Sequence, residues 1–307
     1  LFRSNRNLRI KLRDWMLNHP WFNPFGFTID RFIRNITSRY RMLPDFLIIG
    51  YHKCGTTSLY DYLIQHPQVG KAARKEIRFF DLSYYRGTNW YRSYFPTIFK
   101  KYYFMSSHKM KFITGEATAH YIFHPYAIDR IKKILPNVKI FVLLRNPSDR
   151  AYSHFNHYKR GNLEKASFEE AIMEDNVRLT KLENAFKNNQ IKEHTQRPDW
   201  TPYLSMGIYV NKIKAVFEAF GKDNVMLITL DDLENNTAET LNTVFKFLGI
   251  SEYDIKDLSK KNIGKYEKMN PQTKKLLQNF YKPYNEELEI LTGRKFNWND
   301  DFCIEDN

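Results

Sequence analysis

The sequence has little cysteine and no long apolar run, and both shortages exclude broad classes of protein. Its 307 residues include only 2 Cys, which excludes a disulfide-stabilised scaffold and a multi-cysteine zinc module. The longest apolar runs, Phe46–Ile49 and Ile140–Leu144, are far shorter than the roughly 20 residues of a membrane-spanning helix and have the length of buried strands. With 42% hydrophobic and 27% charged residues, the chain has the composition of a globular protein.

The scarcity of cysteine also bears on the compartment. Because the sequence offers no disulfide pattern, we expect a protein of the reducing cytoplasm. The sequence begins at Leu1 rather than Met, so the alternative is an enzyme of the Golgi lumen whose N-terminal anchor has been removed.

Positive charge is in large excess. Lys and Arg number 48 against 34 Asp and Glu, a formal net charge of +14. Such an excess attracts anions, and nucleic acids, acidic glycans, phosphorylated cofactors and anionic membranes all qualify. Since no nucleic-acid-binding motif is recognisable, we expect no specific nucleic-acid partner. The sequence does not indicate an oligomeric state.

Residues 1–43 form a basic extension that contains 9 Lys or Arg and 2 Asp. From Ile29 to Tyr40 the apolar residues recur at helical spacing, with arginines on the other faces. Two interpretations remain open. This helix either packs on the main domain or lies at the surface and contacts a membrane or a polyanion.

Beyond residue 43, strand and helix patterns alternate. Their order predicts a single α/β domain over residues 44–307, with a mainly parallel sheet covered by helices on both faces and ligands beyond the carboxyl ends of the strands. We expect strands at Phe46–Gly50, Lys139–Leu144 and Val225–Leu230, and helices at Thr57–Gln65, Tyr126–Leu135, Ser148–Tyr158, Phe168–Phe186, Val210–Phe220, Thr237–Leu248 and Gln272–Leu291.

The strongest local signal is the segment that follows the first strand. Gly50 and Gly55 permit close approach of the backbone to a ligand, and the helix that begins near Thr57 offers free amides and a favourable dipole to a phosphate. Lys53 adds a positive charge inside the loop. The segment therefore predicts a P-loop-like phosphate site.

The segment is not the loop of a nucleoside-triphosphate enzyme, which has Lys directly after its second Gly. Thr56 holds that position here. The second strand ends in Arg145 rather than in an Asp that would help to hold Mg²⁺. Asp231 and Asp232, after the last strand, are the remaining candidates for such a role and leave a kinase as an open alternative.

A second phosphate site is predicted where Arg145 follows the second strand. Its guanidinium can make two hydrogen bonds to a phosphate, and Ser153 in the following helix can add a hydroxyl. We expect Ser148 or Asp149 to cap that helix. Two phosphate sites at neighbouring strand ends indicate a nucleotide with phosphates at separated positions.

The two segments together resemble the 5′-phosphosulfate loop and the 3′-phosphate motif of sulfotransferases that use 3′-phosphoadenosine 5′-phosphosulfate (PAPS). The resemblance is closest to the glycan branch, namely the heparan sulfate N- and 3-O-sulfotransferases and their bacterial relatives, and it extends from about Pro44 to Trp298. Further similar blocks are residues 75–81, 90–92, 115–118 and 264–266. The disulfide of many animal members cannot be built here without Cys54, which lies in the phosphate loop.

The resemblance implies that a sulfuryl group passes from PAPS to a hydroxyl or amine of a carbohydrate acceptor, without a metal. It implies catalytic roles for Glu76 as the base and for Lys53 and Lys265 at the leaving group. A raised pKa would suit Glu76 to this task. The residues implied to bind the nucleotide are Lys53, Cys54, Gly55, Thr56, Thr57, Ser58, Arg145, Ser153, Gly264, Lys265 and Tyr266.

The acceptor site is implied to lie beside Glu76, where aromatic faces suit sugar rings and arginines suit carboxylate or sulfate groups. Its candidate residues are Arg78, Trp90, Arg92, His120, Tyr121 and Tyr209. A small alcohol or a phenol is the alternative acceptor.

Overall fold

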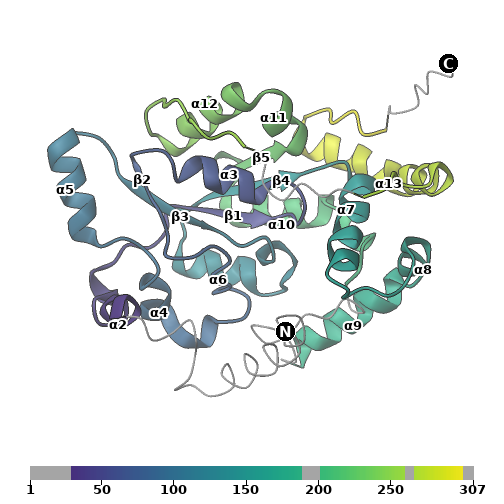
Figure 1. The fold of residues 1–307 in the computed structure, drawn as a ribbon, viewed down its shortest axis with the longest axis horizontal. Coiled ribbons are helices and arrows are strands. Elements are labelled where there is room, and N and C mark those ends of the chain that lie inside the picture. The colour runs from purple at the N-terminus through teal and green to yellow at the C-terminus, as the bar shows by residue number, and fades with distance from the viewer. Residues whose placement is uncertain (1–28, 189–200, 260–265, 300–307) are drawn as a thin grey trace, which may run out of the picture.

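The computed structural model describes residues 29–188, 201–259 and 266–299. In these ranges the chain forms a five-stranded sheet with the order β2-β3-β1-β4-β5, and every pair of neighbouring strands is parallel (Figure 1). The strands are β1 (Phe46–Gly50), β2 (Val69–Gly70), β3 (Ile113–Ala117), β4 (Lys139–Leu144) and β5 (Val225–Thr229). The predicted α/β class is therefore confirmed.

Helices cover both faces of this sheet. Figure 1 shows α3, α11 and α12 on one side of the strands, and α6 and α10 on the other. The helices are α2 (Ile29–Ile36), α3 (Thr56–Leu63), α4 (Gly87–Arg92), α5 (Ile98–His108), α6 (Ala127–Ile134), α7 (Pro147–Arg160), α8 (Phe168–Met173), α9 (Asp175–Lys187), α10 (Val210–Phe220), α11 (Leu230–Asn235), α12 (Thr237–Leu248) and α13 (Pro271–Thr292). No described helix is both long enough and apolar enough to cross a bilayer.

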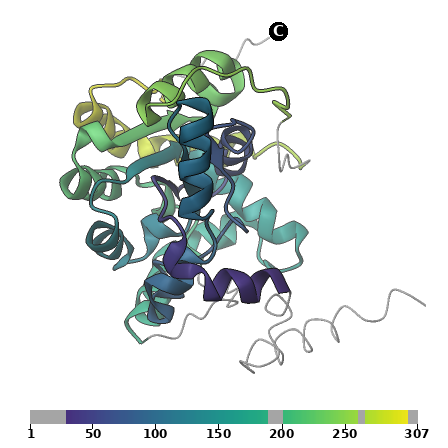
Figure 2. The same ribbon diagram turned by 90° about the vertical axis from the view of Figure 1, so that its left-hand side faces the viewer.

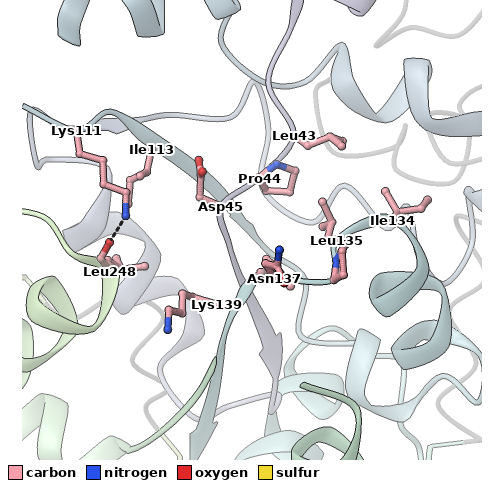
Figure 3. Close-up of a pocket in the computed structure, with 12 residues that line it drawn as sticks. Leu43, Pro44, Asp45, Lys111, Ile113, Ile134, Leu135, Asn137, Lys139 and Leu248 are labelled. Carbon is pink, nitrogen blue, oxygen red and sulfur yellow. Dashed lines mark hydrogen bonds between the residues drawn. The ribbon is translucent and has the colours of Figure 1, made fainter. Parts of the chain in front are cut away.

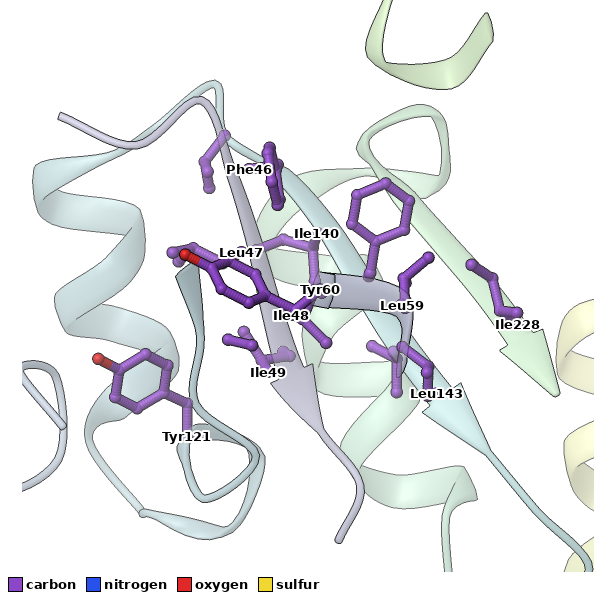
Figure 4. Close-up of a cluster of buried hydrophobic side chains, with 14 of the residues drawn as sticks. Phe46, Leu47, Ile48, Ile49, Leu59, Tyr60, Tyr121, Ile140, Leu143 and Ile228 are labelled. Atoms are coloured by element: carbon purple, nitrogen blue, oxygen red, sulfur yellow. The ribbon is translucent and has the colours of Figure 1, made fainter. Parts of the chain in front are cut away.

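The main hydrophobic core surrounds the two central strands. All five residues of β1 are buried, as are the last five of β4. A strand of a parallel sheet that is covered on both faces needs apolar side chains at every position rather than at alternate ones. Figure 4 shows Leu59 and Tyr60 of α3 beside Ile48 and Ile140 of these strands.

Where the sequence pattern was long and apolar, the observed elements agree with the predicted ones. The predicted bounds of β1, β4, α10 and α12 are those observed. The helix expected over Phe168–Phe186 is instead two helices, α8 and α9, because the chain leaves helical geometry at Glu174. The last strand ends at Thr229, and Leu230 begins α11 rather than ending the strand.

Among the strands and α-helices, β2, β3, α4, α5 and α11 have no counterpart among the expected ones. Strand β3 reads Ile-Thr-Gly-Glu-Ala, which is no apolar run. Its Gly115 faces the ring of Phe46, since an added Cβ would lie 2.5 Å from that ring. This strand is thus defined by its fit against β1 rather than by its own composition.

The described part of the N-terminal extension is attached to the domain through its backbone. Arg41 pairs with Thr97 in an isolated β-bridge, and the Met42 amide donates to the Pro96 carbonyl at 2.9 Å. The Arg92 side chain donates to the Arg41 carbonyl at 2.6 Å. The segment before β1 is therefore part of the packed structure from at least residue 41.

Candidate active site

The loop between β1 and α3 has the geometry of an anion-binding turn. Gly55 lies at φ +89° directly before α3, in the left-handed region that favours glycine. An added Cβ there would lie 3.0 Å from Leu230 and 3.2 Å from Leu233. Thr56 begins α3, so the backbone amides of its first turn lie beside the loop.

The cations of the two predicted phosphate sites lie next to each other. Arg145, directly after β4, places its guanidinium 3.5 Å from the Lys53 carbonyl. Burial lowers the pKa of Lys53, and the charges of Arg160 and Arg145 lower it further. The contact between the Arg145 guanidinium and the Lys53 carbonyl shows that both segments meet at one edge of the sheet, beyond the carboxyl ends of β1 and β4.

Cys54 belongs to the core rather than to the surface of the loop. Its side chain is fully buried, its thiol contacts the His52 carbonyl at 3.6 Å, and burial raises its pKa to about 11. It is a free cysteine. Of Cys54, therefore, only the backbone is available to a phosphate.

Helix α7 continues from Arg145 but is not capped as expected. Asn146 is its N-cap and accepts from the Ser148 amide at 3.0 Å, while Pro147 is the first helical residue. The proline makes Ser148 an internal residue of the helix, so neither Ser148 nor Asp149 caps it. Ser153 is 3% exposed on the same helix.

The loop that carries Glu76 has an unusual backbone. Glu76 has φ 54° and Arg78 has φ 61°, both in the left-handed region. Glu76 is held against the end of β3, because its amide donates to the Ala117 carbonyl at 3.0 Å and its carboxylate accepts from the Ala119 amide at 3.4 Å. Burial raises the pKa of Glu76, and Arg78 and Lys75 counteract that rise. The pKa shift has the direction that the sequence led us to expect.

A buried carboxyl, which the sequence did not single out, underlies this loop. Glu116 of β3 is fully buried and accepts from the Tyr91 hydroxyl at 2.6 Å, the Tyr121 hydroxyl at 2.8 Å and the Thr118 hydroxyl at 3.0 Å. Burial raises its pKa to about 7 despite these three donors. The Tyr121 hydroxyl also accepts from the Phe79 amide at 2.9 Å. Glu116 therefore connects β3 and α4 to the loop that carries Glu76.

The predicted acceptor residues divide into two groups. Two of them are buried tyrosines whose hydroxyls already have partners. Tyr121 donates to Glu116, and the Tyr209 hydroxyl donates to the Arg145 carbonyl at 2.9 Å. Arg92 is held by the Arg41 carbonyl. Since hydrogen bonds inside the fold occupy these three side chains, they shape the site rather than line its open part.

The remaining three predicted acceptor residues lie close to Glu76 in the fold. Arg78 forms an ion pair with the buried Asp81. Trp90 is half-buried and packs on Phe79, with ring centroids 6.2 Å apart. His120 contacts His52, with ring centroids 3.9 Å apart, and burial holds the pKa of His120 well below its usual value. These three side chains surround the loop that carries Glu76 and stay candidates for contact with an acceptor.

Lys75 is a further cation that the sequence analysis did not assign. Its ammonium donates to the Thr57 hydroxyl, so it connects the Glu76 loop to the phosphate loop. Its pKa is lowered chiefly by burial. The signal for it in the sequence was its position next to Glu76.

Of the predicted nucleotide-binding residues near position 265, only Tyr266 belongs to the described part of the chain. Tyr266 contacts Tyr152 of α7, with ring centroids 5.6 Å apart, whereas Gly264 and Lys265 lie outside the described residues.

Asp232, one of the two aspartates that kept a kinase open, is placed differently from a metal ligand. Both oxygens of Asp232 accept from Arg294 at 2.8 Å, and the same carboxylate caps α11 through the Thr229 amide at 2.7 Å. Within the described ranges, no group of three or more His, Cys, Asp or Glu side chains could hold a metal ion. The carboxylate of Asp232 therefore stabilises the fold.

A hollow of about 380 Å³ lies at the opposite end of the sheet (Figure 3). It is lined by residues that precede β1 and begin β3 and β4, among them Asp45, Ile113 and Lys139. Lys111 at its rim donates to the Leu248 carbonyl at 2.7 Å. Because it lies at the amino ends of the strands, this hollow is separate from the residues discussed above.

Comparison with known proteins identifies the family. A family model described as "Sulfotransferase domain" matches residues 43–306, and the chain therefore belongs to the sulfotransferase domain family. It is 26% identical, over 83% of its length, to the membrane-associated sulfotransferase kil1 of Dictyostelium discoideum, of which it spans 66%. It is 27% identical, over 89% of its length, to the bifunctional heparan sulfate N-deacetylase/N-sulfotransferase 3 of Mus musculus, of which it spans 32%.

A solved structure supports the same assignment. The crystal structure of a sulfotransferase from Alicyclobacillus acidocaldarius matches with a TM-score of 0.63 and 28% identity, over 84% of this chain and 99% of that one. The chain spans less than two thirds of the curated relatives named above but nearly the whole of this bacterial protein. The resemblance to sulfotransferases and their fold, expected from the two phosphate motifs, is confirmed.

Proposed function

We propose that this protein transfers a sulfuryl group from PAPS to a hydroxyl or amine of a carbohydrate. The observation that carries the proposal is the contact of Arg145 with the Lys53 loop, which brings two anion-binding segments together at one edge of the sheet. A nucleotide with a 5′-phosphosulfate and a 3′-phosphate needs two such cation sites. The sulfotransferase family model and the heparan sulfate relative support the reaction and the class of acceptor.

The side chains of the donor site fit PAPS in charge and position. Lys53, the amides at the start of α3 and the hydroxyls of Thr56, Thr57 and Ser58 would hold the 5′ end. Arg145 and Ser153 would hold the 3′-phosphate. Bound PAPS would supply an activated sulfuryl group whose bond to the phosphate breaks during transfer. Lys53 would stabilise the negative charge that develops on the leaving phosphate oxygen.

Glu76 would act as the base. Its carboxylate takes the proton from the acceptor hydroxyl or amine as that group bonds to sulfur, which leaves Glu76 protonated and the 3′,5′-bisphosphate (PAP) as the second product. The raised pKa of Glu76 suits proton transfer near neutral pH. Arg78, Trp90 and His120 would contact the acceptor. Gly264 and Lys265, which lie outside the described residues, belong to the proposal on the resemblance alone.

The donor half of the proposal is tested by nucleotide binding. Arg145→Ala should weaken the binding of PAP by roughly 10- to 100-fold, which corresponds to the loss of a charge-assisted hydrogen bond. It should change the affinity for adenosine 5′-phosphosulfate, which lacks the 3′-phosphate, much less. Lys139→Ala is the matched control, because Lys139 is a cation at the amino end of the same strand. Equal losses for both nucleotides would contradict the role of Arg145.

The acceptor half is tested by transfer of labelled sulfate. PAPS is offered with a panel of glycans, small alcohols and phenols, and the products are read by mass spectrometry. We expect sulfated glycans. Sulfation of the small alcohols or phenols alone would favour the alternative acceptor class, and Mg²⁺-dependent binding of ATP without affinity for PAPS would favour a kinase. The cytoplasm, with the Golgi lumen as the alternative, stays a prediction for the compartment.

A further inference from the structure

Helices α2 and α5 lie beside each other on one side of the molecule. Both are at the left of Figure 1, and both face the viewer in Figure 2. Their surroundings are joined by the β-bridge between Arg41 and Thr97 and by a contact of Tyr40 with Phe99, whose ring centroids are 6.3 Å apart. We call their outward side chains the aromatic–basic face. It consists of Phe32, Ile33, Ile36, Arg39, Tyr40, Phe99, Lys100, Tyr102 and Tyr103.

This face exposes much more apolar surface than a helix normally leaves in water. None of the 11 residues of α5 is buried, and Phe99 and Tyr103, four residues apart on one side of the helix, are 70% and 74% exposed. On α2, Phe32 and Ile36 have the same spacing and are 58% and 64% exposed. Contiguous apolar patches of this kind mark surfaces that bind something.

The charges of the face narrow the choice of partner. Arg39 and Lys100 are its exposed cations, whereas Arg31 donates to the Ser93 hydroxyl, Arg34 pairs with Asp30, and Arg41 is buried. The face itself contains no Asp or Glu. A glycan could pair with the two exposed cations but would not cover Ile36 and Phe99. A second copy of the chain, joined face to face, would set Arg39 and Lys100 against their own counterparts.

The preceding segment of the chain is an equally poor cover on grounds of charge. Residues 1–28 contain five Arg or Lys and one Asp, so they would bring positive charge to a positive face. An anionic lipid bilayer offers what none of these partners does, namely negative headgroups beside an apolar boundary layer. Phenylalanine and tyrosine next to lysine is also the composition of segments that lie at membrane interfaces.

We propose that the aromatic–basic face of α2 and α5 docks on the surface of an anionic lipid bilayer, with Phe99 and Tyr103 entering the headgroup region and Arg39 and Lys100 contacting the phosphates. Helix α5 leads into the amino end of β3, whereas the candidate active site lies beyond the carboxyl ends of β1 and β4. This proposal is independent of the identity of the sulfuryl acceptor.

The test is co-flotation of the full chain with vesicles. One set is phosphatidylcholine alone, and the other is phosphatidylcholine with phosphatidylglycerol. We expect binding to the anionic vesicles and little binding to the neutral ones. The double variant Arg39→Glu/Lys100→Glu should weaken binding by at least about 30-fold, given the typical contribution of each Lys or Arg near an anionic surface. Phe99→Ser/Tyr103→Ser should weaken it by a similar factor or more.

The matched control is Lys132→Glu/Lys133→Glu on α6, which changes the net charge by the same amount at a pair of cations away from the face. If this control loses binding as strongly as Arg39→Glu/Lys100→Glu, the attraction comes from overall charge and the proposal fails. It also fails if wild type does not bind anionic vesicles, if both face variants bind like wild type, or if wild type instead forms a dimer that Phe99→Ser/Tyr103→Ser abolishes. Circular dichroism and melting temperature establish that each variant is folded.

Discussion

Replacement of Glu116 by Gln should change how the stability of the protein depends on pH. Burial raises the pKa of this carboxyl from the ordinary 4.5 to about 7. In the unfolded chain Glu116 ionises near pH 4.5, whereas in the folded chain it stays protonated up to about pH 7. Glu116 therefore contributes fully to the free energy of unfolding below its unfolded-state pKa of about 4.5. This contribution is lost as the pH rises to its folded-state pKa of about 7.

The size of the effect follows from the shift. A difference of about 2.5 pKa units corresponds to about 3 kcal/mol of unfolding free energy. Gln cannot ionise but has nearly the shape of protonated Glu, and its amide can bond the same hydroxyls of Tyr91, Tyr121 and Thr118. As the pH rises from about 4.5 to about 7.5, the free energy of unfolding of the variant should therefore rise by about 3 kcal/mol relative to that of wild type. This difference corresponds to about 5 °C in melting temperature for a chain of this length.

Urea unfolding of wild type and Glu116→Gln across this pH range measures the difference. Glu286→Gln, at an exposed position of α13, is the control and should keep the pH dependence of wild type. Parallel curves for wild type and Glu116→Gln would refute the reasoning, since they would mean that Glu116 has the same pKa in the folded and unfolded chains.

Three further predictions concern the candidate site. Glu76→Gln should reduce turnover by ~10²–10⁴-fold while PAP still binds, and near-normal turnover would remove Glu76 from the role of base. In wild type, kcat/KM should fall as the pH drops through the raised pKa of Glu76, so that the acidic limb lies above pH 4.5, and a limb below that value would contradict the burial of Glu76. Gly55→Ala should lower the free energy of unfolding by about 1–3 kcal/mol, because alanine is strained at φ +89° and its Cβ would press on Leu230, and an unchanged urea midpoint would count against this account.

The sequence by itself determined the two central strands and the segments that follow them. In β1 and β4, an uninterrupted apolar run predicts a strand that is buried on both faces, and the residues after each run are neighbours in the chain. Gly50, Lys53 and Gly55 lie within a stretch of six residues, and Arg145 and Pro147 lie within a stretch of three. Such signals are local, and they were sufficient for the fold class and for the resemblance to sulfotransferases.

Only the tertiary structure decided which side chains are free to act. Tyr209 bonds to the carbonyl of Arg145, 64 residues away, and Arg92 to that of Arg41, 51 residues away. Glu116 depends on Tyr91, 25 residues before it. No local pattern encodes these pairs, because each arises where separate elements pack against one another. The exposure of α2 and α5 has the same origin, since an apolar helical face looks identical in sequence whether the fold covers it or leaves it to a partner.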